Sequence, residues 1–362
     1  MSFLKKIFGS GNKQPVINTP GEFWDWFIKE EKSIFNAVKN QQNAMASLDK
    51  VIANLQQLNP GLFALLGMYD DATAELIITP DGDVKNIVFA EDIAKAAPQM
   101  AGWKITALKP AVPIADMSID MYDMEFSSEK ISFFAVNDAA TPDEIEIHIV
   151  HKDYKKDFHK EIASGSLIYL DNLIGEILLA TLVDDIYFDA PDEVTEELIP
   201  IKKLKDYLVW REKEFVEKYE YTRYESTSDE LAIMEAKDKN DLPIIATVDQ
   251  ELLAWDAKAS HPWILNIDIA YKGSATGMPD EKTLQVMYEF EDRLAEKLTA
   301  ANGYLFLGRE TYNNERTTYF ACKEFRECSR IAHRLIKEQG NKLQLSYSIY
   351  KDKYWKTMNR YS

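Results

Sequence analysis

The chain has 362 residues, more than twice the length of a typical domain, so we expect two domains. Hydrophobic residues make up 46% of the sequence, which excludes an intrinsically disordered protein. The formal net charge is −18, and residues 112–200 hold 21 Asp and Glu against 5 Lys and Arg. An acidic protein of this kind repels polyanions, so we expect no nucleic-acid partner.

The two cysteines and the N-terminal residues indicate a cytoplasmic protein. Cys322 and Cys328 are six positions apart on a predicted helix, about 240° apart around its axis, which disfavours a disulfide between them. Reduced thiols are typical of the cytoplasm. In residues 1–18, Lys5 and Lys6 interrupt the apolar stretch, so we expect a flexible tail and no export signal. No run of about 18 apolar residues occurs, so we expect no membrane span.

The predicted first domain, residues 19–220, begins with two helices. Thr19 is the predicted N-cap of the first helix, with Pro20 in its first turn and Glu22 completing a capping box. A second helical pattern of apolar residues runs from Ala44 to Leu55.

The spacing of apolar residues then becomes typical of strands and shorter helices. Residues 76–78 and 87–89 flank a Pro-Asp-Gly-Asp turn, which predicts a β-hairpin. The other elements predicted for this domain are a helix at 91–99, strands at 103–108, 131–136 and 144–151, a helix at 156–174, a buried strand at 176–188 and a helix at 201–220.

The predicted second domain, residues 221–362, starts with a polar linker at 221–229. Its predicted elements are strands at 230–236, 243–249 and 262–271, a helix at 280–300, a hairpin of 303–311 and 316–321, a helix at 323–339 and a strand at 342–350. Strands that enclose two helices in this order predict an antiparallel sheet with both helices on one face, the ferredoxin-like layout. We therefore assign the chain to the α+β class, with two domains.

The second domain resembles the bacterial domain-of-unknown-function family 695. The segments that carry this resemblance are the strand around Trp263, Gly277-Met278-Pro279, Glu291-Asp292, Gly308-Arg309-Glu310-Thr311, Tyr319-Phe320 and Lys351-Asp352-Lys353-Tyr354-Trp355. The first domain resembles a module common in uncharacterised bacterial proteins, through residues 23–27, 96–104 and Gly175-Glu176. The resemblance implies no activity and no catalytic residues, because the family has none established.

Histidines and carboxylates that lie close in the sequence do not predict a metal site. His148 and His151 are three positions apart on a strand and point to opposite faces, while His159 belongs to no His-Glu-x-x-His pattern. The acidic run from Asp184 to Asp192 has no glycine turn and matches no calcium loop, so we expect a solvated loop. No nucleotide-binding Gly-Lys-Ser/Thr motif occurs either, and we expect neither metal nor cofactor.

A set of polar and aromatic residues on the predicted hairpin is the candidate ligand-binding site. Some of these side chains are expected to share one sheet face with Trp263, and such a face is suited to a peptide or small ligand. Cross-strand pairing on a solvated face, or at a domain interface, is the alternative. The candidate residues are Trp263, Tyr304, Arg309, Glu310, Tyr312, Arg316 and Tyr319.

These features favour a non-catalytic module that binds a protein or peptide partner, or regulates one. One alternative is a hydrolase of unrecognised type that uses carboxylates at a cleft between the domains, around Asp184, Asp185 or Glu310. A structural half of a larger assembly, with an exposed apolar patch, is the other. Residues 323–362 hold 10 Lys and Arg against 4 Asp and Glu, so docking of this basic end on the acidic first domain explains both charge asymmetries without any external partner. The sequence leaves the oligomeric state open.

Overall fold

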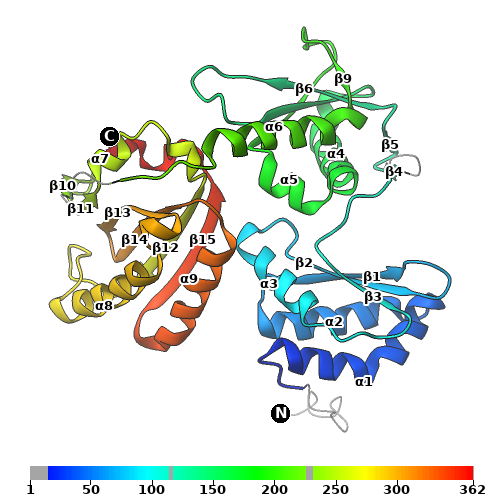
Figure 1. Ribbon diagram of the computed structural model, residues 1–362, viewed down its shortest axis with the longest axis horizontal. Coiled ribbons are helices and arrows are strands. Elements are labelled where there is room, and N and C mark those ends of the chain that lie inside the picture. Colours follow the sequence, from blue (N-terminus) through cyan, green and yellow to red (C-terminus); the bar gives the residue numbers. More distant parts are fainter. Residues whose placement is uncertain (1–14, 114–116, 226–230, 362) are drawn as a thin grey trace, which may run out of the picture. The chain divides into compact units, whose positions relative to one another are not determined.

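The computed structural model describes residues 15–113, 117–225 and 231–361 and divides the chain into two compact units (Figure 1). Unit 1 is residues 1–109 and unit 2 is residues 110–362. The boundary predicted at residue 221 lies inside unit 2 and stays a prediction for a subdivision of that unit; linker residues 226–229 lie outside the described residues. Of the predicted tail, residues 1–14 also lie outside them, while Ile17 is buried and its N–H donates to Gln57 Oε1 at 3.1 Å.

Unit 1 is a three-stranded sheet packed against three helices. The strands are β1 (Phe63–Met68), β2 (Ala74–Thr79) and β3 (Trp103–Ala107), and the helices are α1 (Pro20–Lys39), α2 (Ala44–Leu58) and α3 (Val84–Lys95). Strand β2 pairs antiparallel with β1 and parallel with β3. The capping box of Thr19 and Glu22 is present at the start of α1, as predicted, and α2 begins at the predicted residue.

The hairpin predicted for residues 76–89 is wrong, because its second half is helical. Asp83 caps α3 by accepting a hydrogen bond from Lys85 N–H, and Ile87, Val88 and Ile93 are buried on this helix. The Pro-Asp-Gly-Asp turn therefore leads into a crossover helix between two parallel strands. An apolar run as short as 87–89 fits a strand or a helix equally well, and only the packing decides between them.

The first part of unit 2 is a four-stranded sheet with helices on its buried face. Its order is β8-β7-β6-β9, with β7 and β8 parallel and the other pairs antiparallel. The strands are β6 (Ile131–Val136), β7 (Glu146–His151), β8 (Asp185–Asp189) and β9 (Ile199–Pro200), the helices are α4 (His159–Ile174), α5 (Glu176–Leu182) and α6 (Leu204–Tyr219), and β4 (Ser118–Met121) and β5 (Met124–Ser127) form a hairpin beside them. The core contains Phe133, Ile147, Tyr169, Leu173 and Leu208.

The buried strand predicted at 176–188 is only partly correct. Residues 176–182 form α5, and the strand β8 begins at Asp185. Gly175, with φ at 85°, ends α4 and starts α5, and the two helices meet at 109°. A glycine adopts a positive φ without a steric penalty, so the chain turns sharply between the two helices at this residue. In the described part of the chain, no single helix is long and apolar enough to cross a membrane, and α4 with α5 meets that test only as a bent pair.

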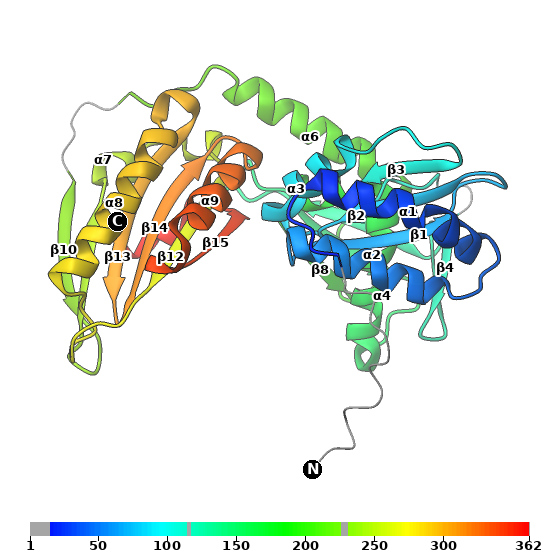
Figure 2. The ribbon, with the colours of Figure 1, turned by 90° about the horizontal axis from the view of Figure 1, so that it is seen from below.

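The second part of unit 2 is a six-stranded antiparallel sheet in the order β10-β11-β13-β14-β12-β15. Helices α8 and α9 contact each other and lie on one face of it (Figure 2). The strands are β10 (Ala232–Lys237), β11 (Pro243–Val248), β12 (Trp263–Ala270), β13 (Tyr304–Tyr312), β14 (Glu315–Cys322) and β15 (Gln344–Lys351), and the helices are α7 (Gln250–Leu253), α8 (Glu281–Lys297) and α9 (Arg326–Gln339). The whole chain is of the α+β class.

Candidate functional site

The seven residues of the candidate ligand-binding set divide between the two faces of the six-stranded sheet. Trp263, Tyr304, Arg309 and Arg316 lie on the face that α8 and α9 cover. Trp263 and Tyr304 both pair with Cys322, so these three side chains share one face. Arg316 lies six positions before Cys322 on β14 and therefore shares that face. Thr311 pairs with Arg316, and Arg309 lies two residues before Thr311 on β13, so Arg309 lies there too. Trp263 and Tyr304 are each only 6% exposed, so nearly all of both side chains packs against other residues of the fold.

Arg309 and Arg316 hold a carboxylate of the covering helix. Arg309 Nη1 lies 2.7 Å from Glu291 Oε2, and Arg316 Nη1 lies 3.4 Å from the same oxygen. The ring of Tyr288, three residues earlier on α8, lies within 5.2 Å of both guanidinium carbons. These contacts fix α8 on the sheet, so both arginines have a structural partner within unit 2.

Glu310, Tyr312 and Tyr319 lie on the opposite face of the same sheet. Glu310 accepts a hydrogen bond from the Tyr361 hydroxyl at 2.7 Å, and the Tyr312 hydroxyl donates to Asp238 at 2.9 Å. The seven residues therefore form two structural clusters, one on each face, rather than a single ligand-binding surface.

The three histidines of the first part of unit 2 have separate surroundings. His148 lies on β7 between Asp189 and Glu146, with Nδ1 2.5 Å from Asp189 Oδ2 and Nε2 2.9 Å from Glu146 Oε1. His151, on the opposite face of β7, is fully buried rather than solvated and bonds to the Glu125 carbonyl oxygen. No group of three metal-binding side chains occurs in the part of the chain that the structure describes.

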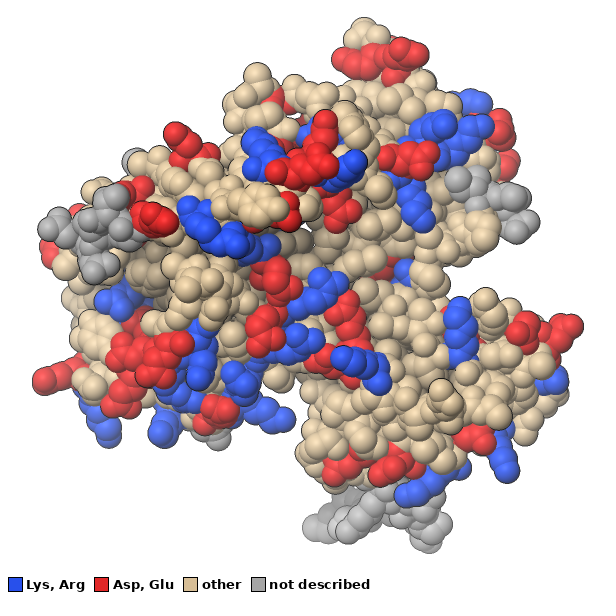
Figure 3. Space-filling model, in the orientation of Figure 1, with Lys and Arg blue, Asp and Glu red and all other residues tan. Residues whose placement is uncertain are grey.

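The basic end of the chain contacts the acidic first part of unit 2. Lys353 Nζ lies 2.8 Å from Asp184 Oδ2 and Lys351 Nζ lies 3.0 Å from Asp184 Oδ1. Lys356 Nζ lies 2.7 Å from Glu144 Oε1. The docking of basic on acidic residues, offered by the sequence as an alternative to an external partner, is thus present within unit 2. On the face of unit 2 seen in Figure 3, acidic and basic side chains are accordingly intermingled.

Asp143 is a second point of this contact. Its carboxylate accepts hydrogen bonds from Lys218, Tyr219 and Tyr354 at 2.7 to 2.9 Å. Burial opposes ionisation of this group, but the three donors outweigh it and lower the pKa of Asp143. Asp184 is likewise buried in ion pairs, so the solvated loop expected around it is not what the structure shows.

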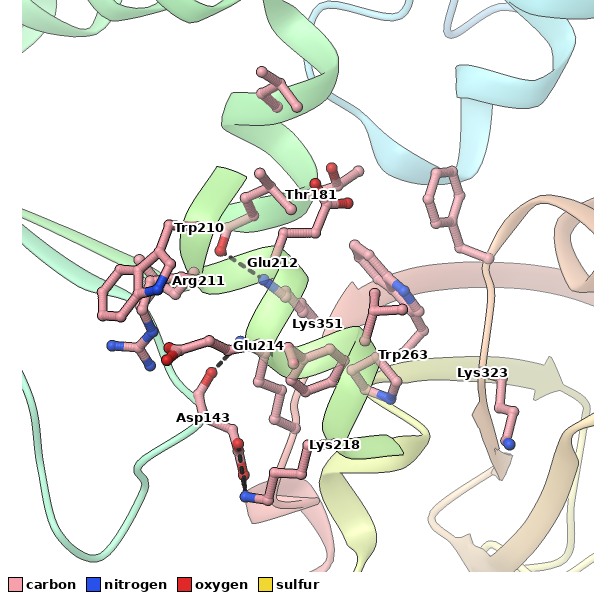
Figure 4. Close-up of a pocket in the computed structure, with 18 of the residues that line it drawn as sticks. Asp143, Thr181, Trp210, Arg211, Glu212, Glu214, Lys218, Trp263, Lys323 and Lys351 are labelled. Carbon is pink, nitrogen blue, oxygen red and sulfur yellow. Dashed lines mark hydrogen bonds and ion pairs between the residues drawn. The ribbon is translucent and has the colours of Figure 1, made fainter. Parts of the chain in front are cut away.

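A pocket of about 790 Å³ lies between these two parts of unit 2. Figure 4 shows side chains of α6 on one side of it, and Trp263 and Lys323 on the other. Four aromatic residues line it: Trp210, Phe215, Trp263 and Phe325. Its charged lining consists of Arg211, Lys218, Lys323, Arg326, Lys351 and Lys353 against Asp143, Glu212 and Glu214.

A family model matches most of the six-stranded sheet and the lysine-containing segment that follows it. Residues 236–361 match a family of unknown function, DUF695. No curated protein and no solved structure matches the chain. The DUF695 segment supplies Trp263, Phe325 and Lys351 to the pocket, and residues before 219 supply the opposite wall.

Lys351, in the segment matched by the DUF695 model, is a buried lysine that shares its carboxylate partner with a second lysine. Burial and the neighbouring Lys353 lower its pKa and Asp184 raises it, with a net lowering to about 8. Two ammonium groups thus share one carboxylate in a site where water is largely excluded.

The pocket has no signature in the sequence, because its lining comes from segments far apart along the chain. Trp210 and Val216 lie off the buried stripe of α6 and are 53% and 52% exposed. The helical pattern of α6 buries Leu204 and Leu208 and leaves these two apolar side chains on its exposed side. Exposed apolar side chains of this kind indicate a binding surface. The segment Lys351–Trp355 carries part of the family resemblance, but its sequence alone does not indicate a pocket.

Proposed function

We propose that unit 2 is a non-catalytic binding module that holds a segment of a partner protein or peptide in the pocket between α6 and the DUF695 segment. The observation that carries this proposal is the pocket itself. A volume of about 790 Å³ is within the range of ligand sites, which are concave and lined by aromatic groups with a few polar ones.

The aromatic lining combines a fixed wall with an exposed anchor. Trp263 and Phe325 pack against each other with ring centroids 4.8 Å apart and are 6% and 4% exposed, so their positions are set before any ligand arrives. Trp210, at 53% exposed, keeps area to bury on binding. A preformed wall lowers the entropic cost of association, and tryptophan is frequent at binding hot spots.

The positions of Asp184, Asp185 and Glu310 support the hydrolase alternative less well than the pocket supports a binding function. Asp184 is held by two lysines, and Glu310 accepts from Tyr361 on the far face of the six-stranded sheet. The pKa of Asp185 is raised by burial and by Glu144 and Asp184, but its side chain does not line the pocket. The three groups therefore do not converge on one cleft, as paired acid–base catalysis requires.

Two finer features belong to the same proposal. The order β15-β12-β14-β13, with α8 and α9 on one face, supports a ferredoxin-like arrangement for residues 263–351. A cytoplasmic location is supported by the free thiols of Cys322 and Cys328, which are both buried.

The test is selection of a phage-displayed library of random peptides on the full chain, followed by calorimetry with the selected peptides. Trp210→Ala should weaken binding roughly tenfold, because an exposed aromatic anchor is removed without disturbing the core. Val209→Ala is the matched control, since Val209 is 46% exposed on the same helix but does not line the pocket. Equal losses in both variants, or none in either, would place the binding site elsewhere.

A further inference from the structure

The floor of the pocket carries an uncompensated positive charge. Lys351 and Lys353 are ion-paired to the two oxygens of the single carboxylate of Asp184. Their side chains are 12% and 4% exposed, and that of Asp184 is 9% exposed. Two cations against one anion leave a net charge of one, in surroundings where solvent screens it poorly.

Lys351 also has donor capacity beyond its contacts within the chain. Its Nζ donates to Asp184 Oδ1 and, at 2.9 Å, to the Leu182 carbonyl oxygen. An ammonium group has three N–H donors; two meet these oxygens, and the neighbouring Lys353 ammonium carries donors only and cannot accept the third. Lys351 lines the pocket, and an oxygen atom of a ligand can accept from the third donor.

Two other basic side chains of the lining are bound only by uncharged acceptors among the described residues. Arg211 donates to the Asn137 side-chain oxygen and the Pro142 carbonyl oxygen, both at 2.7 Å, and also to the Tyr207 hydroxyl and the Glu144 carbonyl oxygen. Lys323 donates to the Thr222 carbonyl oxygen. Burial and the nearby Arg223 both lower the pKa of Lys323, as expected for a cation that lacks a neighbouring anion.

An apolar surface adjoins the Lys351 ammonium. In the sheet, Trp263 of β12 lies directly opposite Lys351 of β15, so the two side chains are on the same face. Phe325 extends that surface, since its ring packs on the indole of Trp263. A ligand that fits here carries an anionic group and an apolar group next to each other.

We propose that the pocket binds an acidic peptide segment, with a carboxylate paired to Lys351 and a neighbouring apolar side chain packed on Trp263 and Phe325. The inference rests on the proposed binding function and specifies its ligand. A carboxylate matches the single excess charge at the floor. A phosphate dianion exceeds it and would meet Glu212 and Glu214 on the α6 wall, so a phosphorylated segment is disfavoured.

The experiment is a double-mutant cycle between ligand and protein. A peptide selected on the full chain is made with each Asp replaced by Asn and each Glu by Gln, and affinities are measured for wild type and Lys351→Met. Each single change should weaken binding roughly tenfold, and the double change should add little, because both remove the same contact. Lys356→Met is the control, since it removes an equal charge from an ion pair that does not line the pocket.

The outcomes separate this inference from the function on which it rests. Additive losses in the cycle, or selected peptides that lack a required carboxylate yet lose affinity in Trp210→Ala, overturn the acidic ligand and leave the binding pocket in place. Selected peptides indifferent to Trp210→Ala, or a library without any binder, overturn both. Lys351→Arg keeps the charge and should retain the preference for the acidic peptide, which separates loss of the contact from misfolding.

Discussion

Lys353 and Asp184 lie 169 residues apart in the chain, yet Lys353 Nζ is 2.8 Å from Asp184 Oδ2. The pair joins the segment after β15 to the loop before β8. Lys353 also donates to the Asp143 carbonyl oxygen and lies 5.0 Å from the Phe215 ring centroid. The DUF695 segment is therefore attached to the first part of unit 2 through buried, paired charges.

Asp184→Asn should destabilise the folded protein by about 3–5 kcal/mol, because it leaves two buried lysines without their carboxylate. Urea denaturation monitored by circular dichroism measures this change. Asp185→Asn is the control, since Asp185 is exposed and repelled by Glu144 and Asp184, and it should cost little. A loss below about 1 kcal/mol for Asp184→Asn would show that the contact is not a structural one.

His148 should stabilise the fold at acidic pH and lose that contribution at alkaline pH. Burial opposes its protonation, but Glu146 and Asp189 outweigh burial and raise its folded-state pKa above 6.5. A histidine whose pKa is higher in the folded than in the unfolded state makes its whole contribution to the unfolding free energy below pH 6.5. That contribution disappears as the pH rises through the folded-state pKa. The unfolding free energies of wild type and His148→Gln should therefore differ most below pH 6.5 and converge at alkaline pH.

His261 should have the opposite effect on pH dependence. Burial, with Lys323 and Arg223 nearby, lowers its pKa to about 3. The unfolded chain binds a proton at this residue below pH 6.5 while the folded protein does not, so stability falls as the pH drops from 6.5 towards 3. His261→Gln should flatten that part of the pH profile. An unchanged acid limb in urea titrations would show that His261 is protonated in the folded state.

Binding of an acidic peptide should be accompanied by proton uptake near pH 8. Lys351 has a pKa of about 8 in the free protein, raised by Asp184 and lowered by Lys353 and burial. A ligand carboxylate is a second anion beside Lys351, so the pKa of Lys351 rises on binding. About half a proton should be taken up at pH 8 and almost none at pH 6.5. The other charged groups that line the same pocket are Asp143, Arg211, Glu212, Glu214, Lys218, Lys323 and Arg326.

Calorimetry at pH 8 in buffers of different ionisation enthalpy measures this uptake directly. Lys351→Met should abolish it, while Lys356→Met should leave it intact. Proton release, or uptake that persists in Lys351→Met, would contradict a carboxylate bound at Lys351.

The sequence predicted those elements whose local signals agree with the packing. The capping box at Thr19 starts α1, and Asn313 and Asn314 form the turn between β13 and β14 with φ of 45° and 69°. The interpretation was wrong for short apolar runs such as 87–89 and 176–182, because consecutive apolar residues show neither the helical nor the strand period. Cys322 ends β14 rather than sharing a helix with Cys328, so the angular argument against their pairing does not apply.

The candidate site was less predictable than the fold. A hairpin rich in arginine and tyrosine resembles a ligand surface in one dimension, but the alternation of β13 and β14 sends neighbouring residues to opposite faces. Arg309 thus contacts Glu291 of α8, whereas Glu310 contacts Tyr361. The pocket depends on Trp210, Trp263 and Lys351, which become neighbours only through tertiary packing.

The pairing of Lys351 with Trp263 sets a limit on how this chain can change its length. Side chains of β15 alternate between faces, so deleting one residue between 345 and 350 turns every following side chain over. The lysine would leave Asp184, and Asp352, which now accepts from the N–H groups of Lys356 and Thr357, would lose its place as a cap. Single substitutions along β15 should consequently be far better tolerated than the insertion or deletion of one residue.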